Sequence, residues 1–134
     1  MSNISAEDEY ISLSFPVNAA YVSAARLTAS SIASRMGFDV DEIEDIKTAV
    51  SEACTYIIKK ITIDTKKTFK IQFALKQDIL EISLTTGGPL AEYSDDEIGF
   101  MMIKALMDSL DVDITDDDDI KVLMVKKHKR NIFS

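Results

Sequence analysis

The hydrophobic and polar residues of this chain follow two different periods along its length. Apolar residues recur about every three to four positions from about Ala19 to Met36 and from Asp39 to about Lys60, which predicts two consecutive helices. Gly37 separates the two segments and is suited to the left-handed conformation that often ends a helix. Asp39 followed by Glu42 has the spacing of a capping box, so we expect the second helix to begin there.

Alternation of apolar and polar residues predicts strands in the rest of the chain. The strands are expected at residues 10–15, 68–75, 79–85, 112–114 and 122–125. A second capping-box sequence, residues 94–97, opens a third helix that should reach about Leu110. Met102 is expected on its inward side, and Met101 and Met102 are expected either in the core or on an adaptable surface. The order β-α-α-β-β-α-β-β predicts an α+β fold, a two-layer α/β sandwich whose mixed, mostly antiparallel sheet is covered on one face by three helices.

The length of the chain predicts a single domain. Its 134 residues leave no room for a second core of useful size. We expect a flexible N-terminal tail at residues 1–9, one folded domain at residues 10–128 and a C-terminal tail at residues 129–134. The basic stretch 126–130, which includes His128, is expected to be solvated, with contact to an acidic partner as the alternative.

Charge and composition narrow the class of partner. Lys and Arg number 15 against 23 Asp and Glu, which gives a net charge of −8. Such a surface repels phosphate backbones and anionic lipid, so we expect neither a nucleic acid nor a membrane as partner. The N-terminal residues are polar and acidic, unlike a signal peptide, and the single cysteine, Cys54, falls on a helical pattern as a buried small hydrophobe. Both features favour a cytoplasmic protein.

Three stretches of the sequence carry a family resemblance. Residues 41–55 read Asp-Glu-Ile-Glu-Asp-Ile-Lys-Thr-Ala-Val-Ser-Glu-Ala-Cys-Thr, residues 26–37 belong to the preceding helix, and Leu-Met-Asp stands at 106–108. Together they resemble the anti-sigma-factor serine/threonine kinases of the GHKL, or histidine-kinase-like ATPase, superfamily, which has the Bergerat fold. The resemblance implies a partner-switching regulator of transcription. Such a protein is commonly a homodimer that binds ATP with Mg²⁺, phosphorylates a serine of a STAS-type anti-anti-sigma protein and sequesters a sigma factor.

The positions that carry this family's chemistry are only partly kept. Glu52 stands where the resemblance places the general base, a carboxylate that accepts a proton from the attacking hydroxyl. Tyr56 is expected on the polar face of the second helix and stands where the family has an asparagine that helps to hold Mg²⁺. A neutral phenol on a bulky ring is a poor ligand for that ion. Thr86 stands where an aspartate would accept the adenine amino hydrogen, so a charge-assisted hydrogen bond becomes a neutral one.

The phosphate-binding segment is altered as well. Gly88 is kept in the loop after the strand, and Gly99 is what remains of the glycine-rich lid whose backbone amides cradle phosphates. The three carboxylates of residues 95–97 crowd the start of the third helix, where they repel a triphosphate. We therefore predict a pseudokinase with a vestigial base, degenerate nucleotide-binding positions and no bound cofactor.

Three functions remain open on these residues. The first is an anti-sigma-like regulator that acts by binding a sigma factor, a STAS-type antagonist or a second copy of itself. The second is an active serine/threonine protein kinase that uses ATP and Mg²⁺, and the third is an interaction domain of a different complex. Arg26 matches an arginine that, by the resemblance, contacts both partners, so we expect it at the interface. The acidic run 111–119 lacks the glycine and the final glutamate of a calcium loop, so we predict no metal site.

Overall fold

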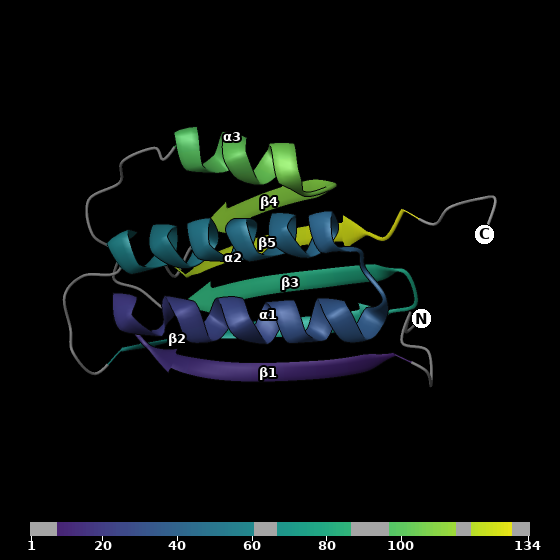
Figure 1. The fold of residues 1–134 in the computed structure, drawn as a ribbon. Helices are drawn as coiled ribbons and strands as arrows, with labels where there is room; N and C mark the ends of the chain where they lie inside the picture. The colour runs from purple at the N-terminus through teal and green to yellow at the C-terminus, as the bar shows by residue number, and fades with distance from the viewer. Residues whose placement is uncertain (1–7, 61–66, 87–96, 115–118, 130–134) are drawn as a thin grey trace, which may run out of the picture.

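A computed structural model of the chain describes residues 8–60, 67–86, 97–114 and 119–129 (Figure 1). In these segments the elements are β1 (Glu9–Pro16), the 3-10 turn η1 (Ala19–Tyr21), α1 (Val22–Met36), α2 (Val40–Lys60), β2 (Thr68–Lys76), β3 (Ile79–Thr86), α3 (Glu97–Leu106), β4 (Ser109–Ile114) and β5 (Ile120–Lys127). The predicted order of strands and helices is confirmed. The third helix ends at Leu106 and not near Leu110, because Leu110 already pairs with β5 as part of β4.

The strands of the described residues form one sheet in the order β1-β2-β3-β5-β4, and every neighbouring pair is antiparallel. Helices α1, α2 and α3 lie side by side across one face of this sheet (Figure 1). The predicted α+β sandwich is thus confirmed, with a sheet that is antiparallel throughout these strands.

The core lies between the sheet and the helices, because alternation along each strand turns one set of side chains toward the helical layer. The two neighbouring strands β2 and β3 contribute three fully buried large side chains each: Phe69, Ile71, Phe73, Leu80, Ile82 and Leu84. Each such side chain contributes about 1.5–3 kcal/mol on burial. The expectation that Met102 lies on the inward side of its helix is wrong, because α3 carries apolar residues on both sides and Met102 is 39% exposed. Cys54 on α2 is part of this core, as predicted, and burial raises the pKa of its thiol to about 12. The thiol is therefore protonated and inert at neutral pH.

The junction of α1 and α2 is built as the sequence indicates. Gly37 ends α1 with a φ of 92°, and its backbone N–H donates to the carbonyl oxygen of Ser34 at 3.1 Å. At the start of α2 the Glu42 N–H donates to Asp39 Oδ1 at 2.8 Å and the Asp39 N–H donates to Glu42 Oε1 at 2.9 Å. This reciprocal pair is the predicted capping box.

Glu42 has a second role that the capping pattern does not reveal. Its side chain is buried, with Oε1 2.7 Å from His128 Nδ1 and Oε2 accepting the Lys129 N–H at 2.8 Å. The His128 ring also packs edge-on against Phe38, with 5.4 Å between ring centroids. The expectation that His128 is solvated is therefore wrong, because a buried carboxylate 86 residues earlier in the chain holds it. We call these four residues, Phe38, Glu42, His128 and Lys129, the C-terminal clamp.

Candidate functional site

The residues singled out from the sequence come from α2, α3 and the end of β3. Glu52 and Tyr56 lie on the C-terminal half of α2, Thr86 is the last residue of β3, and Gly99 lies in the first turn of α3. These three parts of the chain meet at the same end of the sheet (Figure 1). Gly88 lies outside the described residues. The fold thus gathers four of the five positions predicted for the nucleotide site at one end of the molecule, while the sixth predicted site residue, Arg26, lies on α1.

Tyr56 is a core residue at the contact between α2 and α3. Its exposed fraction is 2%, and its ring lies 4.8 Å from the ring of Phe100, centroid to centroid, at an interplanar angle of 59°. An aromatic pair with this geometry contributes about 0.5–1.5 kcal/mol beyond the area that it buries. The expectation that Tyr56 belongs to the polar face of its helix is wrong, because α3 packs over this side of α2.

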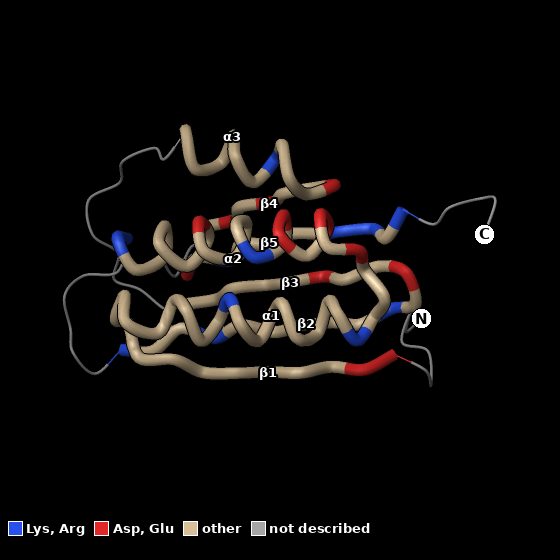
Figure 2. The backbone as a smooth tube through the Cα atoms, viewed as in Figure 1, with Lys and Arg blue, Asp and Glu red and all other residues tan. Residues whose placement is uncertain are grey.

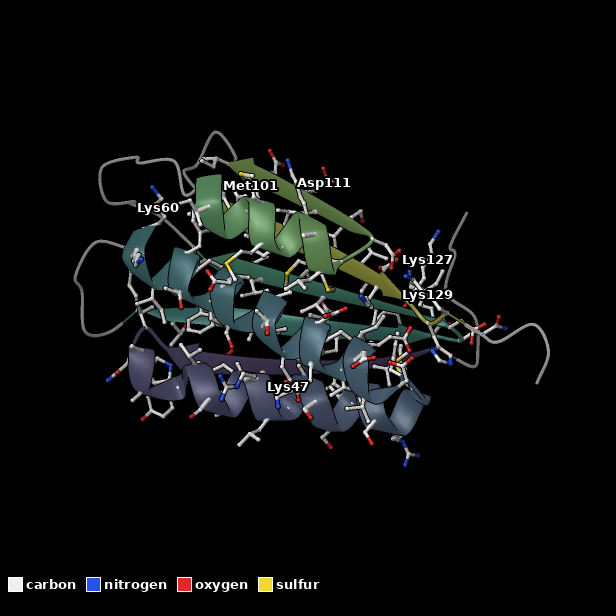
Figure 3. All side chains as sticks on the ribbon, turned by 45° about the horizontal axis from the view of Figure 1, so that its top comes forward. Lys47, Lys60, Met101, Asp111, Lys127 and Lys129 are labelled. Carbon is white, nitrogen blue, oxygen red and sulfur yellow. The ribbon has the colours of Figure 1, made fainter. Side chains whose placement is uncertain are left out.

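Lys60 is a site residue that the sequence reasoning missed. It is the last residue of α2, it is buried, and its Nζ lies 5.6 Å from the centroid of the Tyr56 ring (Figure 3). An ammonium over an aromatic face is attracted by the ring quadrupole, and a cation at a helix C-terminus is favoured by the helix dipole. The spacing of four residues from Tyr56 was the available signal, because it places the two side chains one turn apart on one face.

Glu52 is half-buried and precedes Tyr56 by one helical turn. Helical spacing puts it on the side of α2 that faces α3. Within the described part of the chain no hydrogen bond or ion pair holds its carboxylate. The carboxylate is therefore available to accept a proton or to meet a positively charged partner.

Thr86 is buried at the end of β3, where it lies opposite Ile120 of β5. A cavity of about 370 Å³ adjoins it, with Lys70, Thr85 and Lys121 among its lining residues. Those three residues lie in register on adjacent strands, and they alternate with residues that face the core. The cavity therefore opens on the sheet face away from the helices, not toward Glu52.

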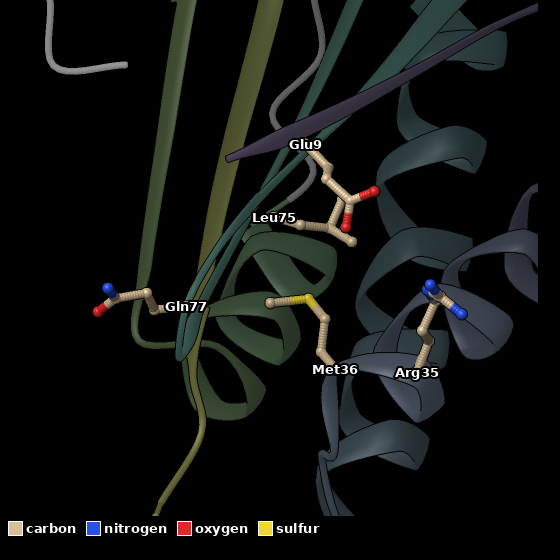
Figure 4. Close-up of a pocket in the computed structure, with 5 residues that line it drawn as sticks. All are labelled: Glu9, Arg35, Met36, Leu75 and Gln77. Atoms are coloured by element: carbon tan, nitrogen blue, oxygen red, sulfur yellow. The ribbon is translucent and has the colours of Figure 1, made fainter. Parts of the chain in front are cut away.

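A second cavity of about 400 Å³ lies at the opposite end of the fold (Figure 4). It is formed by the start of β1, the end of α1 and the turn between β2 and β3, and it is lined by Glu9, Arg35, Met36, Leu75 and Gln77. Figure 4 shows the Glu9 carboxylate and the Arg35 guanidinium on two sides of it. None of the predicted site residues belongs to it.

Arg26 lies apart from the residues around Glu52. It is exposed on α1, next to Leu27, whose side chain is also exposed. Helix α2 lies between α1 and α3 (Figure 1), so Arg26 and the Tyr56–Phe100 contact are on different sides of the helical layer. An exposed arginine beside an exposed leucine is suited to contact with another protein.

Two further observations concern metals and membranes. The described residues contain no group of three or more His, Cys, Asp and Glu side chains that could hold a metal ion. Part of the acidic run, residues 115–118, lies outside them. Among the described helices, none has the length and apolar character needed to cross a membrane.

Comparison with known proteins gives consistent matches. Residues 15–126 match the family model described as a histidine kinase-like ATPase domain. The chain is 34% identical to the serine-protein kinase RsbW of Bacillus cereus (strain Q1), with 91% of this chain and 87% of the relative covered. It is 33% identical to the serine-protein kinase RsbW of Bacillus mycoides (strain KBAB4) over the same shares.

A solved structure shares the fold. The crystal structure of the RsbU and RsbW domains of Rv1364c from Mycobacterium tuberculosis matches with a TM-score of 0.74 at 17% identity. The match covers 92% of this chain and 33% of that chain, so this chain corresponds to about a third of the longer protein.

Proposed function

Because the chain belongs to the histidine kinase-like ATPase family, with serine-protein kinases named RsbW among its relatives, we propose that it is an anti-sigma-factor-like regulator that acts by binding proteins and not by transferring phosphate. Its partners are a sigma factor, a STAS-type anti-anti-sigma protein or both, and it works in the cytoplasm as a homodimer. These partners and the dimer come from the family resemblance. The loss of phosphate transfer comes from the side chains of the site.

The packing of Tyr56 is the observation that carries this proposal. At the position where the resemblance implies a magnesium ligand, the side chain is instead buried against Phe100 and Lys60. Mg²⁺ requires compact oxygen ligands in near-octahedral geometry, and a ring held between two helices supplies no such ligand. The residues present therefore fit Mg²⁺ poorly, and no phosphoryl-transfer step is assigned to them. The neutral hydroxyl of Thr86, in place of a carboxylate for adenine, supports the same conclusion.

Nucleotide binding tests the proposal directly. We expect the melting temperature of the chain to be unchanged by millimolar Mg·ATP, since a ligand that does not bind the folded state does not stabilise it. The serine-protein kinase RsbW of Bacillus cereus is the matched positive control. A dose-dependent rise in melting temperature for this chain, comparable to that of the control, would falsify the proposal that the site does not bind Mg·ATP.

An active kinase is the second candidate, and the state of Glu52 is what favours it. The carboxylate is half-buried without a partner in the described residues, as a general base needs to be. Incubation with radiolabelled ATP and a STAS-type protein from the same genome separates the two candidates. We expect no transfer. Label on the STAS protein that disappears in Glu52→Gln would establish the kinase instead.

Partner binding tests the regulatory half of the proposal. We expect the chain to bind a sigma factor of its own genome, and Arg26→Ala to weaken that binding by about tenfold or more. Arg35→Ala is the matched control, because Arg35 is an exposed arginine at the other end of the same helix. Equal effects of the two substitutions would remove Arg26 from the interface. If the chain binds no sigma factor, the hypothesis that it is an interaction domain of a different complex is favoured.

The proposed homodimer has its own measurement. Sedimentation equilibrium of the full chain is expected to give twice the mass of one chain, 14.9 kDa. A monomer at micromolar concentration would contradict this part of the proposal alone, because binding of a sigma factor is measured separately.

A further inference from the structure

The first residue of β1 departs from the alternation of its strand. The inward-facing side chains of β1 lie opposite buried residues of β2, and three of them are apolar: Ile11, Leu13 and Phe15. Glu9 continues this series, because it lies opposite Leu75, which is also buried, and paired residues on antiparallel strands point to the same face of the sheet. A carboxylate thus occupies a position where the pattern of the strand calls for an apolar side chain. Departures of this kind are expected at functional sites.

Glu9 lines the cavity of about 400 Å³ at the end of α1 (Figure 4). The Arg35 guanidinium lies on another side of this cavity, and Met36 and Leu75 supply apolar walls. Figure 2 shows the acidic start of β1 and a basic residue at the end of α1 at the same end of the molecule. The volume is at the lower end of the range for small-molecule sites, which is about 300–1,000 Å³.

The two charged groups of the cavity are not neutralised by their neighbours. Within the described segments, neither the Glu9 nor the Arg35 side chain forms a hydrogen bond or an ion pair. Lys76 follows Leu75 in the chain but points to the other face of the sheet, where its Nζ lies 3.3 Å from Glu81 Oε2. The cavity therefore presents one negative and one positive group that do not satisfy each other.

A small zwitterion has the chemistry that satisfies both groups at once. A guanidinium donates two parallel hydrogen bonds to a carboxylate, and the Glu9 carboxylate accepts hydrogen bonds from an ammonium group. An apolar substituent of the ligand then contacts Leu75 and the adaptable thioether of Met36. A ligand with charges of one sign would instead meet a like charge on one side of the cavity.

We propose that this cavity binds an α-amino acid with an apolar side chain, or a dipeptide of such residues, with its carboxylate on Arg35 and its ammonium group on Glu9. None of the residues around Glu52 lines the cavity. The proposal is therefore independent of the proposed function, and the failure of either leaves the other standing. Sigma-factor binding by Arg35→Ala is measured without such a ligand, so it remains a valid control for Arg26→Ala.

A titration followed by NMR tests binding and its location together. The full chain is titrated with L-leucine and with leucyl-leucine, and the backbone amide signals are followed. We expect saturable shifts at Met36, Leu75 and Gln77 with a dissociation constant of about 1 mM or tighter for at least one of the two probes. The absence of saturable shifts up to about 10 mM, or shifts confined to other parts of the chain, overturns the proposal.

Two derivatives of leucine test the chemistry of the ligand. L-leucinamide keeps the ammonium group and lacks the carboxylate, whereas N-acetyl-L-leucine keeps the carboxylate and lacks the ammonium group. Each derivative should bind about tenfold more weakly than L-leucine, because each loses one charge-assisted pair. Equal affinities of the three compounds would show that the cavity does not recognise a zwitterion.

Substitutions assign each charge of the ligand to one residue. Arg35→Gln should remove the preference for L-leucine over L-leucinamide and keep the preference over N-acetyl-L-leucine, and Glu9→Gln should do the reverse. Unfolding cannot produce this crossed pattern, because each variant retains one preference. Lys104→Gln and Glu44→Gln are the controls, since they remove the same charges from exposed positions on α3 and α2. Identical losses in both cavity variants, or matching losses in the controls, overturn the assignment.

A direct ion pair between Glu9 and Arg35 gives a different result. In that case the two single substitutions and the double substitution lower the free energy of unfolding non-additively, and no probe binds. Urea unfolding of the three variants measures this coupling. Non-additive losses without ligand binding would show that the two residues serve the fold and would refute the ligand site.

Discussion

Removal of one charge from the C-terminal clamp tests how strongly the end of β5 is held to α2. The two carboxylate oxygens of Glu42 accept hydrogen bonds from the Asp39 N–H, the Lys129 N–H and His128. Glu42→Gln replaces one of these oxygens with an NH₂ group, which cannot accept a hydrogen bond. The new amide NH₂ then faces a backbone N–H or the His128 ring, and a buried donor left without an acceptor costs about 1–3 kcal/mol. The remaining bonds lose their charge assistance, which is roughly half of their strength.

We therefore expect Glu42→Gln to lower the free energy of unfolding by about 2–3 kcal/mol, or the melting temperature by roughly 6–12 °C for a domain of this size. Urea unfolding followed by circular dichroism measures this. Glu44→Gln is the control on the same helix, since Glu44 forms an exposed pair with Lys47 at 3.0 Å and its loss should cost at most about 0.5 kcal/mol.

The dependence on pH provides a second readout. Burial alone would raise the pKa of Glu42, but the backbone N–H groups of Asp39 and Lys129 and the contact with His128 hold it below its ordinary value of 4.5. A carboxyl group with a lowered pKa stabilises the fold fully above pH 4.5, and this contribution is lost as the pH falls through the folded-state value. The gap between the unsubstituted chain and Glu42→Gln should therefore narrow as the pH falls below 4.5. Equal losses for Glu42→Gln and Glu44→Gln would refute the clamp.

Three further substitutions test other contacts. Tyr56→Ala should cost about 3–5 kcal/mol in urea unfolding, because it leaves a cavity beside Phe100, and a loss below about 1 kcal/mol would mean that this ring is not packed as described. Lys126→Met should cost about 1–2 kcal/mol by the same measurement, since Asp45 is partly exposed and can be solvated when its partner is lost; no loss would show that the pair contributes nothing. Gly37→Ala should cost about 1 kcal/mol through its φ of 92° alone, because a new Cβ meets no atom within 4 Å, and a stabilised variant would contradict this.

Much of the candidate site could be predicted from the sequence around Glu52. The helix that carries Glu52 and Tyr56, and the strand that ends at Thr86, are where their periodicity places them. The burial of Tyr56 was not visible, since tyrosine has an apolar ring and a polar hydroxyl and its position on α2 fits either face. Lys60 was missed for a similar reason, because a lysine at the end of a helix is usually solvated.

The sequence alone determined the order of the elements, the layered fold and the caps where α1 ends and α2 begins, because these depend on interactions between residues close together in the chain or on the period of burial. The capping box predicted at residues 94–97 lies outside the described residues. Only the tertiary structure decided which side of α3 is buried, that Phe100 closes over Tyr56, and that His128 reaches Glu42. These contacts join residues that are far apart in the chain. They depend on how helices and strands are positioned against one another, and no local pattern specifies that arrangement.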